Sequence, residues 1–581
     1  MTVHGEASAP VRARKPGSRG SRDARQHPSA ETLTGAAAAV LAAVPAWWRA
    51  KASAAGLAGD WLEVDKVMAP PGFVDLDTNP DASVKVSWSP EQFGEAYVGA
   101  LSSSTRSSHG RYYTPTSLAK PLWQRTREAL GFPQRHQTLP GLVRDPACGA
   151  GALLLAPLRE HLQASRHADP TMLLASVASR VHGIDNDPVA VWLTNVMLAS
   201  ELLPVLSQIP EHRRRDLPRF AEVGDAMTAS LAPADVTIMN PPYGRVKLSD
   251  EERDRFDDYL HGHANLYGIF MGIGADSVNQ TEGVLAALVP TSFLSGRYSS
   301  ALRDTLSTSV RLKSIDFVDT RSGVFDGVLQ ETCLAVFTAR RIRRTTVHVI
   351  GEGPTKIATV DTPRTDNPWP LPRRSDDAPA AAAALAMPNT LADVGWKVST
   401  GPLVWNRRRD DLDEQPRGDT DAVPVIWAAD LDGGQLHRDP SRAHHRYLHL
   451  TVDSDPDVMV HDTPAVLVQR TTAPEQARRL VTLELTQDDL DKWGGRVVVE
   501  NHVNVLNPTC DNPTVDRTTL ARLLASATID RVFRCLAGSV AVSAYELEAL
   551  PLPDDATLAE WSTISEHEDL ERAVAAAYRP S

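Results

Sequence analysis

The sequence predicts an α/β protein with a doubly wound, mostly parallel sheet, followed by a second domain of the α+β type. Short apolar segments alternate with helical stretches from about residue 141 to residue 340, which is typical of a parallel sheet covered by helices. Three of these segments end in loops rich in glycine or aspartate, and doubly wound sheets bind ligands at such strand ends. A chain of 581 residues is too long for one hydrophobic core, so we expect more than one domain.

The chain divides by composition into five parts. Residues 1–30 are rich in arginine, lysine, serine, glycine and proline, which predicts a disordered basic tail, and residues 31–108 predict a helical region. Residues 109–350 hold the sheet, residues 351–390 are rich in proline, aspartate and alanine and predict a linker, and residues 391–581 form the second domain. The strands expected in the sheet are 142–144, 180–184, 236–239, 284–289, 313–318 and 332–338.

Composition narrows the class of protein. Hydrophobic residues make up 42% of the chain and charged residues 23%, as in ordinary globular proteins. The net charge of −13 argues mildly against a protein that binds polyanions over its whole surface, but it leaves room for a local basic face. The four cysteines are scattered, without a CxxC pair or a nearby histidine cluster, so we expect neither disulfides nor a metal site, in a reducing cytoplasm. We identify no membrane span.

A glycine-rich loop follows the first expected strand, in the order Asp-Pro-Ala-Cys-Gly-Ala-Gly from Asp145 to Gly151. Gly149 and Gly151 would let the backbone approach a ligand closely, and the helix that follows would present its N-terminus. The Asp145 carboxylate could pair with a ligand's ammonium group. A GxG sequence is also common in tight strand-to-helix turns, so the loop alone is weak support for a ligand site.

Two further aspartates stand at strand ends, Asp185 after the second strand and Asp225 in the turn Gly-Asp-Ala-Met. An acidic residue at the tip of the second strand is where a ribose diol is usually held, but the gap from Gly151 to Asp185 is longer than NAD-binding folds have. Asp225 could lie beside an adenine amino group. Each aspartate alone could be a helix N-cap. Three of them at successive loops favour a ligand site.

The most informative segment is Asn240-Pro241-Pro242-Tyr243, which follows the apolar run 236–239. An asparagine, two prolines and an aromatic residue make a rigid turn that can hold amide and carbonyl oxygens beside a flat ring. Such a site suits a planar amine, whose two hydrogens it can accept while the ring stacks. The alternative is a strand-ending turn with a buried tyrosine.

In their order along the chain, these motifs resemble the amino-group DNA methyltransferases, specifically the N6-adenine enzymes of type II restriction–modification systems. In the family's gamma arrangement, the cofactor motifs come first in the chain, the catalytic motif follows, and the target-recognition region comes last. The resemblance covers about residues 109–340, beginning with Arg-Tyr-Tyr-Thr-Pro at 111–115. Further matching segments are 264–270, 289–294, 323–325 and 332–337, with looser matches at 499–504 and 545–553.

The resemblance implies a class I methyltransferase domain that uses S-adenosylmethionine and no metal, and a C-terminal domain that recognises double-stranded DNA. It implies that Asn240 and the Pro241 carbonyl accept hydrogen bonds from the target amine, and that Tyr243 and Phe325 stack on an adenine rotated out of the duplex. The residues implied to hold the cofactor are Tyr113, Thr114, Asp145, Ala147, Gly149, Gly151, Asp185, Asp225 and Ala226. No catalytic cysteine is required, so Cys148 receives no nucleophilic role.

Several alternatives stay open. The acceptor could be the N4 amine of cytosine, although serine is more usual at position 240 in those enzymes, or a protein glutamine, which would not need the residues after 390. A DNA-specificity protein without catalysis is disfavoured by the intact loop and by Asn240. The stretch before residue 109 is too short for a nuclease domain, so cleavage would belong to a separately encoded restriction endonuclease.

We expect a monomer. Candidate DNA contacts are Arg407–Arg409, Arg470, Arg478, Arg479 and the arginines of 340–344.

Overall fold

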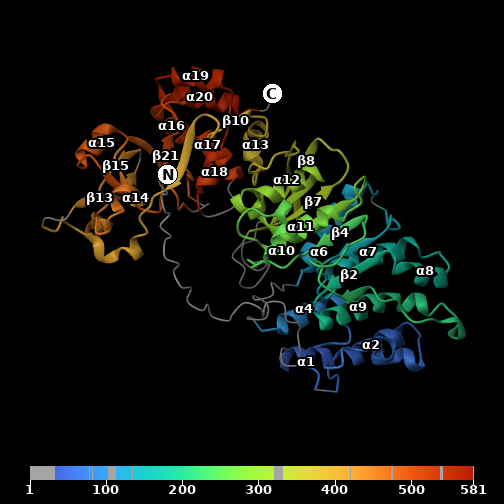
Figure 1. Ribbon diagram of the computed structural model, residues 1–581. Coiled ribbons are helices and arrows are strands. Elements are labelled where there is room, and N and C mark those ends of the chain that lie inside the picture. Colours follow the sequence, from blue (N-terminus) through green and yellow to red (C-terminus); the bar gives the residue numbers. More distant parts are fainter. Residues whose placement is uncertain are drawn as a thin grey trace, which may run out of the picture.

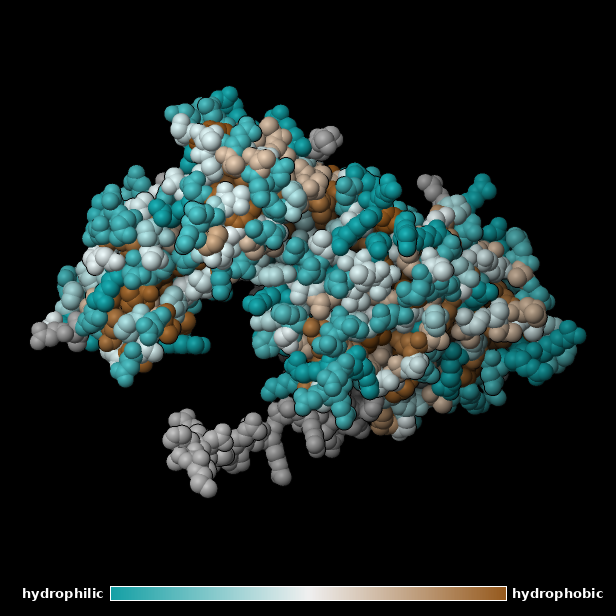
Figure 2. Space-filling view, turned by 45° about the horizontal axis from the view of Figure 1, so that its top comes forward, coloured by the Kyte–Doolittle hydropathy of each residue, from teal (hydrophilic) through white to brown (hydrophobic). Residues whose placement is uncertain are grey.

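The computed structural model describes residues 33–579, apart from 34, 78, 82, 103–112, 134, 319–330, 352, 419–420, 433, 473–475 and 537–540. The expected basic tail at 1–30 and Phe325 therefore lie outside the described residues. Figure 1 shows two halves, with the helices and strands of the first 350 residues in one and those after residue 390 in the other. Figure 2 shows a hollow between the two halves.

The first half is built on a nine-stranded sheet with the order β3-β2-β1-β4-β5-β7-β6-β8-β9. Neighbours from β3 to β5 are parallel, and β7 is antiparallel to both β5 and β6. The first seven positions have the strand order of the class I methyltransferase fold, so the predicted doubly wound, mostly parallel sheet is confirmed. The strands are β1 (Val143–Asp145), β2 (Val181–Asp185), β3 (Ala221–Val223), β4 (Val236–Met239), β5 (Val284–Pro290), β6 (Arg311–Val318), β7 (Thr332–Thr338), β8 (Arg344–Ile350) and β9 (Pro354–Asp361).

Both faces of this sheet are buried, and alternate residues of β5 show it. Val284, Ala286 and Leu288 belong to one hydrophobic core, whereas Leu285, Ala287 and Val289 belong to a second core on the opposite face. Two-sided burial explains why the strand is a continuous apolar run instead of an alternating one. The covering helices are α6 (Thr116–Leu130), α7 (Ala152–Ala164), α8 (Pro170–Val177), α9 (Pro188–Leu206), α10 (Asp250–Arg255), α11 (Leu266–Asp276) and α12 (Ser300–Thr308).

The N-terminal helices extend one of these cores. Trp47 and Trp48 are fully buried, and their indole N–H groups donate to the carbonyls of Trp88 and Trp61. Both tryptophans belong to the same core as β1, α7 and α9, so this region packs on the sheet domain. The helices are α1 (Gly35–Ala42), α2 (Val44–Ala54), α3 (Val64–Val67) and α4 (Pro90–Ala100).

Helix α9 is the one element of the described chain that is long and apolar enough to cross a membrane, with a mean hydropathy of 1.7 over 18 residues. We identified no such segment from the sequence, which was wrong for this helix by length and composition alone. The same window is 83% buried inside the fold, and a core helix of a soluble protein passes the same test. A helix that is packed on all sides must be apolar all round, which accounts for its composition.

The composition of residues 351–390 predicted a linker, but much of this segment has regular structure. Residues Pro354–Asp361 form β9, the edge strand paired antiparallel with β8. Residues Ala378–Ala384 form helix α13, and Ala380, Ala383 and Ala384 are buried in the core of the second half. The prediction of a linker was therefore wrong for these two stretches. In α13 the reason is that small side chains such as alanine also suit close packing between elements.

The second half contains a four-stranded sheet with the order β11-β21-β18-β19 and a five-stranded sheet with the order β12-β16-β13-β20-β17. Its strands are β10 (Asn389–Thr390), β11 (Trp396–Thr400), β12 (Leu412–Asp413), β13 (Ala422–Ile426), β14 (Leu431–Asp432), β15 (Gln435–Leu436), β16 (Tyr447–His449), β17 (Val460–His461), β18 (Ala465–Gln469), β19 (Thr482–Leu485), β20 (Val497–Val499), β21 (Val503–Pro508) and β22 (Pro551–Leu552). Its helices are α14 (Asp455–Met459), α15 (Gln487–Lys492), α16 (Arg517–Leu524), α17 (Ala527–Leu536), α18 (Ala544–Glu548), α19 (Asp555–Ser562) and α20 (His567–Ala577).

One buried arginine joins the two halves. Arg303 of α12 is fully buried, and its guanidinium donates to the carbonyls of Phe293 and Gly296 at 2.9 Å. The same group donates to the Asp366 carbonyl at 2.7 Å and to the Tyr545 hydroxyl of α18 at 2.8 Å. Four acceptors from three parts of the chain therefore depend on one side chain.

We predict that Arg303→Met lowers the free energy of unfolding by about 3 kcal/mol, because the buried acceptors lose their donor. Tyr545→Phe, which removes one hydroxyl from the same joint, should cost about 1 kcal/mol. Thermal denaturation of the two variants beside the parent protein tests this order. Equal melting temperatures for Arg303→Met and the parent would show that the joint does not depend on Arg303.

Candidate active site

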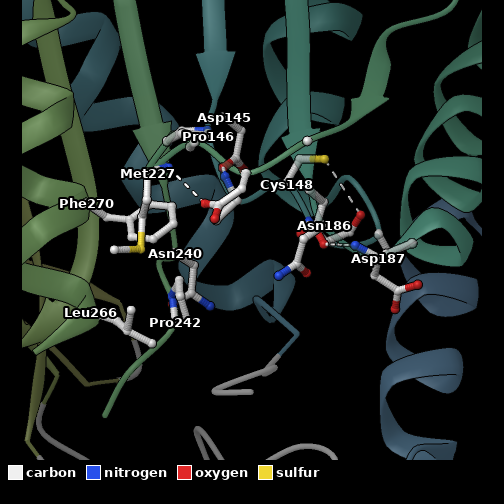
Figure 3. A pocket seen from close by; sticks show the side chains of 18 of the residues that line it. Asp145, Pro146, Cys148, Asn186, Asp187, Met227, Asn240, Pro242, Leu266 and Phe270 are labelled. Atoms are coloured by element: carbon white, nitrogen blue, oxygen red, sulfur yellow. Dashed lines mark hydrogen bonds between the residues drawn. The ribbon is translucent and has the colours of Figure 1, made fainter. Parts of the chain in front are cut away.

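A cavity of about 540 Å³ opens at the carboxyl ends of β1, β2 and β4, where the strand order reverses. This is the crevice in which open α/β sheets bind ligands, and the volume suits a small organic molecule. Figure 3 shows the cavity with Asp145 at its strand end, Cys148, Asn186 and Asp187 on one side, and Met227, Phe270 and Pro242 on the other.

Three hydrogen bonds to backbone groups fix the loop after β1. Asp145 Oδ1 accepts from the Ala147 N–H at 3.0 Å, and the Gly149 N–H donates to Asp185 Oδ2 at 2.9 Å. The Thr194 hydroxyl of α9 donates to the Gly149 carbonyl at 2.7 Å. Gly149 and Gly151 have φ angles of 51° and 81°, which only glycine adopts without strain. The loop is thus a fixed cradle at the floor of the cavity.

The tip of β2 is equally constrained. Asp185 uses its second oxygen, Oδ1, to accept from the Asp187 N–H at 2.9 Å. Asp187 caps α9 by accepting from the Val189 N–H, and its other oxygen accepts from the Tyr97 hydroxyl at 3.3 Å. Each carboxylate oxygen has more than one acceptor position, so Asp185 can also accept from a ligand in the cavity.

Asp145 is an unusual acid, because its side chain is almost completely buried. The pKa of the Asp145 carboxyl is raised to about 8, because burial outweighs the lowering by the Ala147 N–H and the nearby Asp185 carboxylate adds to the rise. An acid in this environment is mostly neutral at pH 7 and becomes charged when a cation is brought beside it. The site is therefore electrostatically prepared for a cationic group.

Cys148 lies in the same loop, and burial raises the pKa of its thiol well above the usual value. A thiol that stays protonated is a poor nucleophile. No group of three or more histidine, cysteine, aspartate or glutamate side chains within the described ranges is arranged to hold a metal ion.

Apolar side chains line the wall opposite Asp185. Asp225 Oδ1 accepts from the Met227 N–H at 2.9 Å, which fixes the turn after β3. Met227, Phe270 and Pro242 line this part of the cavity (Figure 3). A flat ring could lie between these side chains, with the Asp225 carboxylate at its edge.

The segment before α6 reaches the cavity from the other direction. The Tyr113 hydroxyl is buried and has no hydrogen-bond partner among the described residues. Its ring packs so closely on Gly94 that a Cβ there would lie 2.6 Å from the ring. The neighbouring Thr114 hydroxyl accepts from Asn240 Nδ2 at 3.1 Å. Both residues line the cavity, and Thr114 orients the Asn240 amide.

Asn240 lines the cavity at the end of β4, whereas Tyr243 does not. The Tyr243 hydroxyl lies 3.1 Å from Asn240 Oδ1 and 3.0 Å from the Leu288 carbonyl oxygen, between two acceptors. Its ring meets Tyr267 edge-on, with the centroids 6.4 Å apart. In this conformation Tyr243 supports the Asn240 amide from behind and presents no ring to the cavity.

Most of the residues that the sequence singled out converge on this one cavity. Those on its wall are Tyr113, Thr114, Asp145, Ala147, Gly149, Asp185, Asp225, Ala226, Asn240 and Pro242. Gly151, Pro241 and Tyr243 are not on the wall, and Phe325 lies outside the described residues.

Sequence reasoning assigned no role to several other wall residues, among them Tyr97, Asn186, Met227, Leu266 and Phe270. Leu266 and Phe270 stand four residues apart on α11 and so share one face of that helix, a spacing that the sequence already displays. Tyr97 lies 90 residues before its partner Asp187, and no local signal links the two.

The strand order and the place of the cavity define a protein with the class I methyltransferase fold, and comparisons with known proteins give a narrower group. A family model described as Eco57I restriction-modification methylase matches residues 180–325. The chain is 26% identical over 334 residues to the type II methyltransferase M.PstI of Providencia stuartii, and 24% identical over 335 residues to M.BsuBI of Bacillus subtilis. Each match covers 54% of this chain and 64% of the relative, which is less than two thirds of the relative's length.

Solved structures give more distant matches. The type IIL restriction-modification enzyme MmeI, in complex with DNA, has a TM-score of 0.48 and 13% identity, covering 87% of this chain and 80% of that one. The type IIG restriction endonuclease BpuSI has a TM-score of 0.46 and 13% identity, covering 93% and 72%. The family model describes a restriction-modification methylase and the curated relatives are type II methyltransferases, which is the class that the sequence motifs resemble.

The cradle generates a prediction about Gly183 of β2. A Cβ at this position would lie 2.8 Å from Cys148 Sγ and 2.9 Å from Cys148 Cβ, so the strand or the loop must shift. We expect Gly183→Ala to lower the free energy of unfolding by about 1–3 kcal/mol, as overpacking does. The matched control is Gly99→Ala, where nothing lies within 4 Å of the added atom and the stability should stay the same or rise. Thermal melts that are identical for the two variants would contradict this account of the loop.

Proposed function

We propose that this protein is a site-specific DNA methyltransferase, which transfers a methyl group from S-adenosylmethionine to N6 of adenine in double-stranded DNA. In this proposal it is the modification enzyme of a restriction–modification system. The observation that carries the proposal is that Asn240, of the Asn-Pro-Pro-Tyr turn, lines the same cavity as Asp145, Asp185 and Asp225. A donor molecule and an acceptor amine could therefore meet in one enclosed space.

The groups of the cavity fit the cofactor part by part. Met227, Phe270 and Pro242 would hold the adenine ring, and Asp185 would accept hydrogen bonds from the ribose hydroxyls. The ammonium group would pair with Asp145, and Tyr113 would contact the cofactor from the wall of the cavity. The sulfonium of the bound cofactor supplies an electrophilic methyl group. The remaining predicted contacts, at Thr114, Ala147, Gly149, Gly151 and Ala226, belong to the same proposal.

Asn240 activates the acceptor in this mechanism. The lone pair of an aromatic amine is delocalised into its ring, which makes the nitrogen a poor nucleophile. In the proposal, Asn240 Oδ1 and the Pro241 carbonyl accept hydrogen bonds from the amine and draw it toward tetrahedral geometry, since a carbonyl oxygen has two acceptor positions. Thr114 and Tyr243 hold the amide in place, so Asn240 has no freedom to turn away. The transfer is direct and needs no covalent enzyme intermediate.

Access to N6 requires that the adenine leave the duplex. Base extrusion costs a few kcal/mol, and stacking on an aromatic ring offsets about 1–3 kcal/mol of it. In the proposal, Tyr243 and Phe325 supply these rings. Because Tyr243 lies behind Asn240 and not on the cavity wall, its stacking role requires that the turn rearrange when DNA binds.

Three alternatives remain distinguishable by product. Cytosine N4 methylation would use the same turn and cofactor, and methylation of a protein glutamine would label polypeptides. A DNA-specificity protein without catalysis would bind DNA and transfer nothing. The partners belong to the proposal as well. They are double-stranded DNA and a separately encoded restriction endonuclease, with the protein acting as a monomer in the bacterial cytoplasm.

We predict that Asn240→Ala reduces methyl transfer at least a hundredfold while cofactor affinity stays within about threefold, because one of the two acceptors at the amine is lost. DNA from cells that express the parent protein should carry N6-methyladenine in one short motif, detected by single-molecule sequencing and by nucleoside mass spectrometry. DNA from the variant should not. N4-methylcytosine in the parent sample would replace the adenine assignment, and label in polypeptides alone would overturn the DNA proposal.

Cofactor binding should depend on pH through Asp145. Below its pKa of about 8 the carboxyl must release a proton to pair with the ammonium, so the affinity falls as the pH falls. The ammonium group of the cofactor loses its proton above about pH 8, so the affinity should be highest near that pH. We expect the Kd measured by calorimetry to rise about tenfold between roughly pH 8 and pH 6.5. Asp145→Asn should bind more weakly at pH 8 and show little change over this range. A dependence that persists in Asp145→Asn would assign the titration to another group.

A further inference from the structure

Aromatic and basic side chains gather at one place in the second half of the chain, on the five-stranded sheet. Trp405 and Trp427 lie on either side of His445, with ring centroids 5.9 Å and 6.3 Å from the histidine ring. Arg409 lies over the Trp405 ring at 5.2 Å, and Arg442 lies over the Trp427 ring at 5.0 Å. We call these five residues the tryptophan–arginine patch.

The patch is built from three segments that are distant in sequence. Trp405 belongs to the short 3-10 helix Trp405–Arg407, Trp427 follows β13, and Arg442 and His445 belong to the 3-10 segment Pro440–His445. The Trp427 indole N–H donates to the His445 carbonyl at 2.9 Å, which fixes the two segments to each other. The arrangement is therefore a product of the tertiary fold and not of one basic run.

The guanidinium groups of Arg409 and Arg442 are exposed to solvent. Within the described part of the chain, no acidic group forms an ion pair with Arg409 or Arg442, nor with exposed Arg407 beside them. The pKa of His445 is lowered by burial and by its neighbours His444, Arg409 and Arg442, so this histidine is neutral at pH 7 among cationic groups.

Acidic side chains nearby are already committed to other partners. Asp411 and Asp455 pair with Arg408, at 2.6 Å and 2.7 Å. Asp430 is buried, and it accepts from the backbone N–H groups of Trp427 and Asp439. Asp410, which directly follows Arg409 in the sequence, is exposed. Asp439 accepts from the Ser441 N–H, and Arg442 helps to lower the pKa of its carboxyl. With Arg407, Arg409 and Arg442, the surface still holds more cationic than acidic side chains, in a protein whose net charge is −13.

Several of the other arginines proposed from the sequence are less suited to contact a partner. Arg408 is held by its two aspartates, and Arg479 is buried with its guanidinium bonded to the Thr472 carbonyl. Arg344 pairs with Asp361, Arg340 with Glu282, and Arg478 donates to the Ala525 carbonyl. Within Arg407–Arg409, the residues Arg407 and Arg409 are the two whose guanidinium groups form no ion pair with a described acidic group.

We propose that the tryptophan–arginine patch is a surface on which the C-terminal half binds double-stranded DNA. This inference rests on the proposed function and deepens it, because it names the residues of the recognition domain that meet the duplex. Exposed guanidinium groups bind phosphate oxygens or guanine edges in fork geometry, and the aromatic rings beneath keep them extended. In Figure 1 the segments around residues 400–450 form the lower end of the C-terminal half, and Figure 2 shows the hollow that separates this half from the catalytic half.

The test uses the full chain with Arg409→Gln and Arg442→Gln combined. The probe is a fluorescein-labelled duplex that carries the motif methylated in the expression host, and anisotropy is measured over a series of salt concentrations. We expect the Kd for the duplex to rise at least tenfold, and the slope of log affinity against log salt to shrink by about 1.8 if both arginines contact phosphates. Cofactor affinity and the melting temperature should not change.

Two controls separate the patch from general loss of charge. Arg166→Gln combined with Arg215→Gln removes two exposed arginines of the catalytic half and should leave the duplex affinity unchanged. Arg409→Lys combined with Arg442→Lys keeps both charges. It should preserve the salt slope, and it should methylate additional motifs if either arginine reads a base.

The outcomes distinguish the two proposals. If the parent protein methylates and binds DNA, and the double glutamine variant does both equally well, the patch is not a DNA surface, while the proposed function stands. If the parent protein neither methylates nor binds any duplex, the proposed function fails, and this inference fails with it. An equal loss of affinity in the Arg166 and Arg215 control would also overturn the inference, because the effect would then come from net charge.

Discussion

The Asp185 carboxylate connects the two loops on which the cavity depends. One of its oxygens accepts from the Gly149 N–H in the loop after β1, and the other accepts from the Asp187 N–H that leads into α9. A carboxylate that accepts from backbone donors forms charge-assisted hydrogen bonds, which are stronger than neutral ones. The floor and one wall of the cavity therefore keep a fixed separation. A cradle of this kind needs little reorganisation when a ligand enters.

The packing around this link makes the cradle rigid. The sheet is buried on both faces, and Thr194 of α9 reaches the Gly149 carbonyl from the helix that the N-terminal tryptophans cover. The same rigid frame also orients the Asn240 amide through Thr114 and Tyr243. The polar groups of the cavity are thus positioned by elements whose own places are set by hydrophobic burial, which a loop-only site could not achieve.

Charge is distributed unevenly over the molecule. Acidic side chains concentrate in the cavity, where burial raises the pKa of Asp145 to about 8, whereas the tryptophan–arginine patch gathers cationic groups at the other end. A cationic small molecule and a polyanion would be attracted to different places on one chain. The buried joint around Arg303 and Tyr545 holds the two regions in one molecule, so both ligands could be bound at once.

The sequence by itself determined the sheet and the chemical character of the cavity. Strands β4 and β7 were predicted with the observed bounds, and most predicted cofactor residues line the same cavity, because glycine, aspartate and proline at strand ends constrain the backbone locally. The tertiary structure alone decided the rest. The alanine-rich stretch that looked like a linker became α13, Tyr97 met Asp187, Tyr243 turned toward Leu288, and the tryptophans and arginines of the patch came together. These contacts join residues far apart in the chain, and their geometry depends on how whole elements pack, which no local pattern encodes.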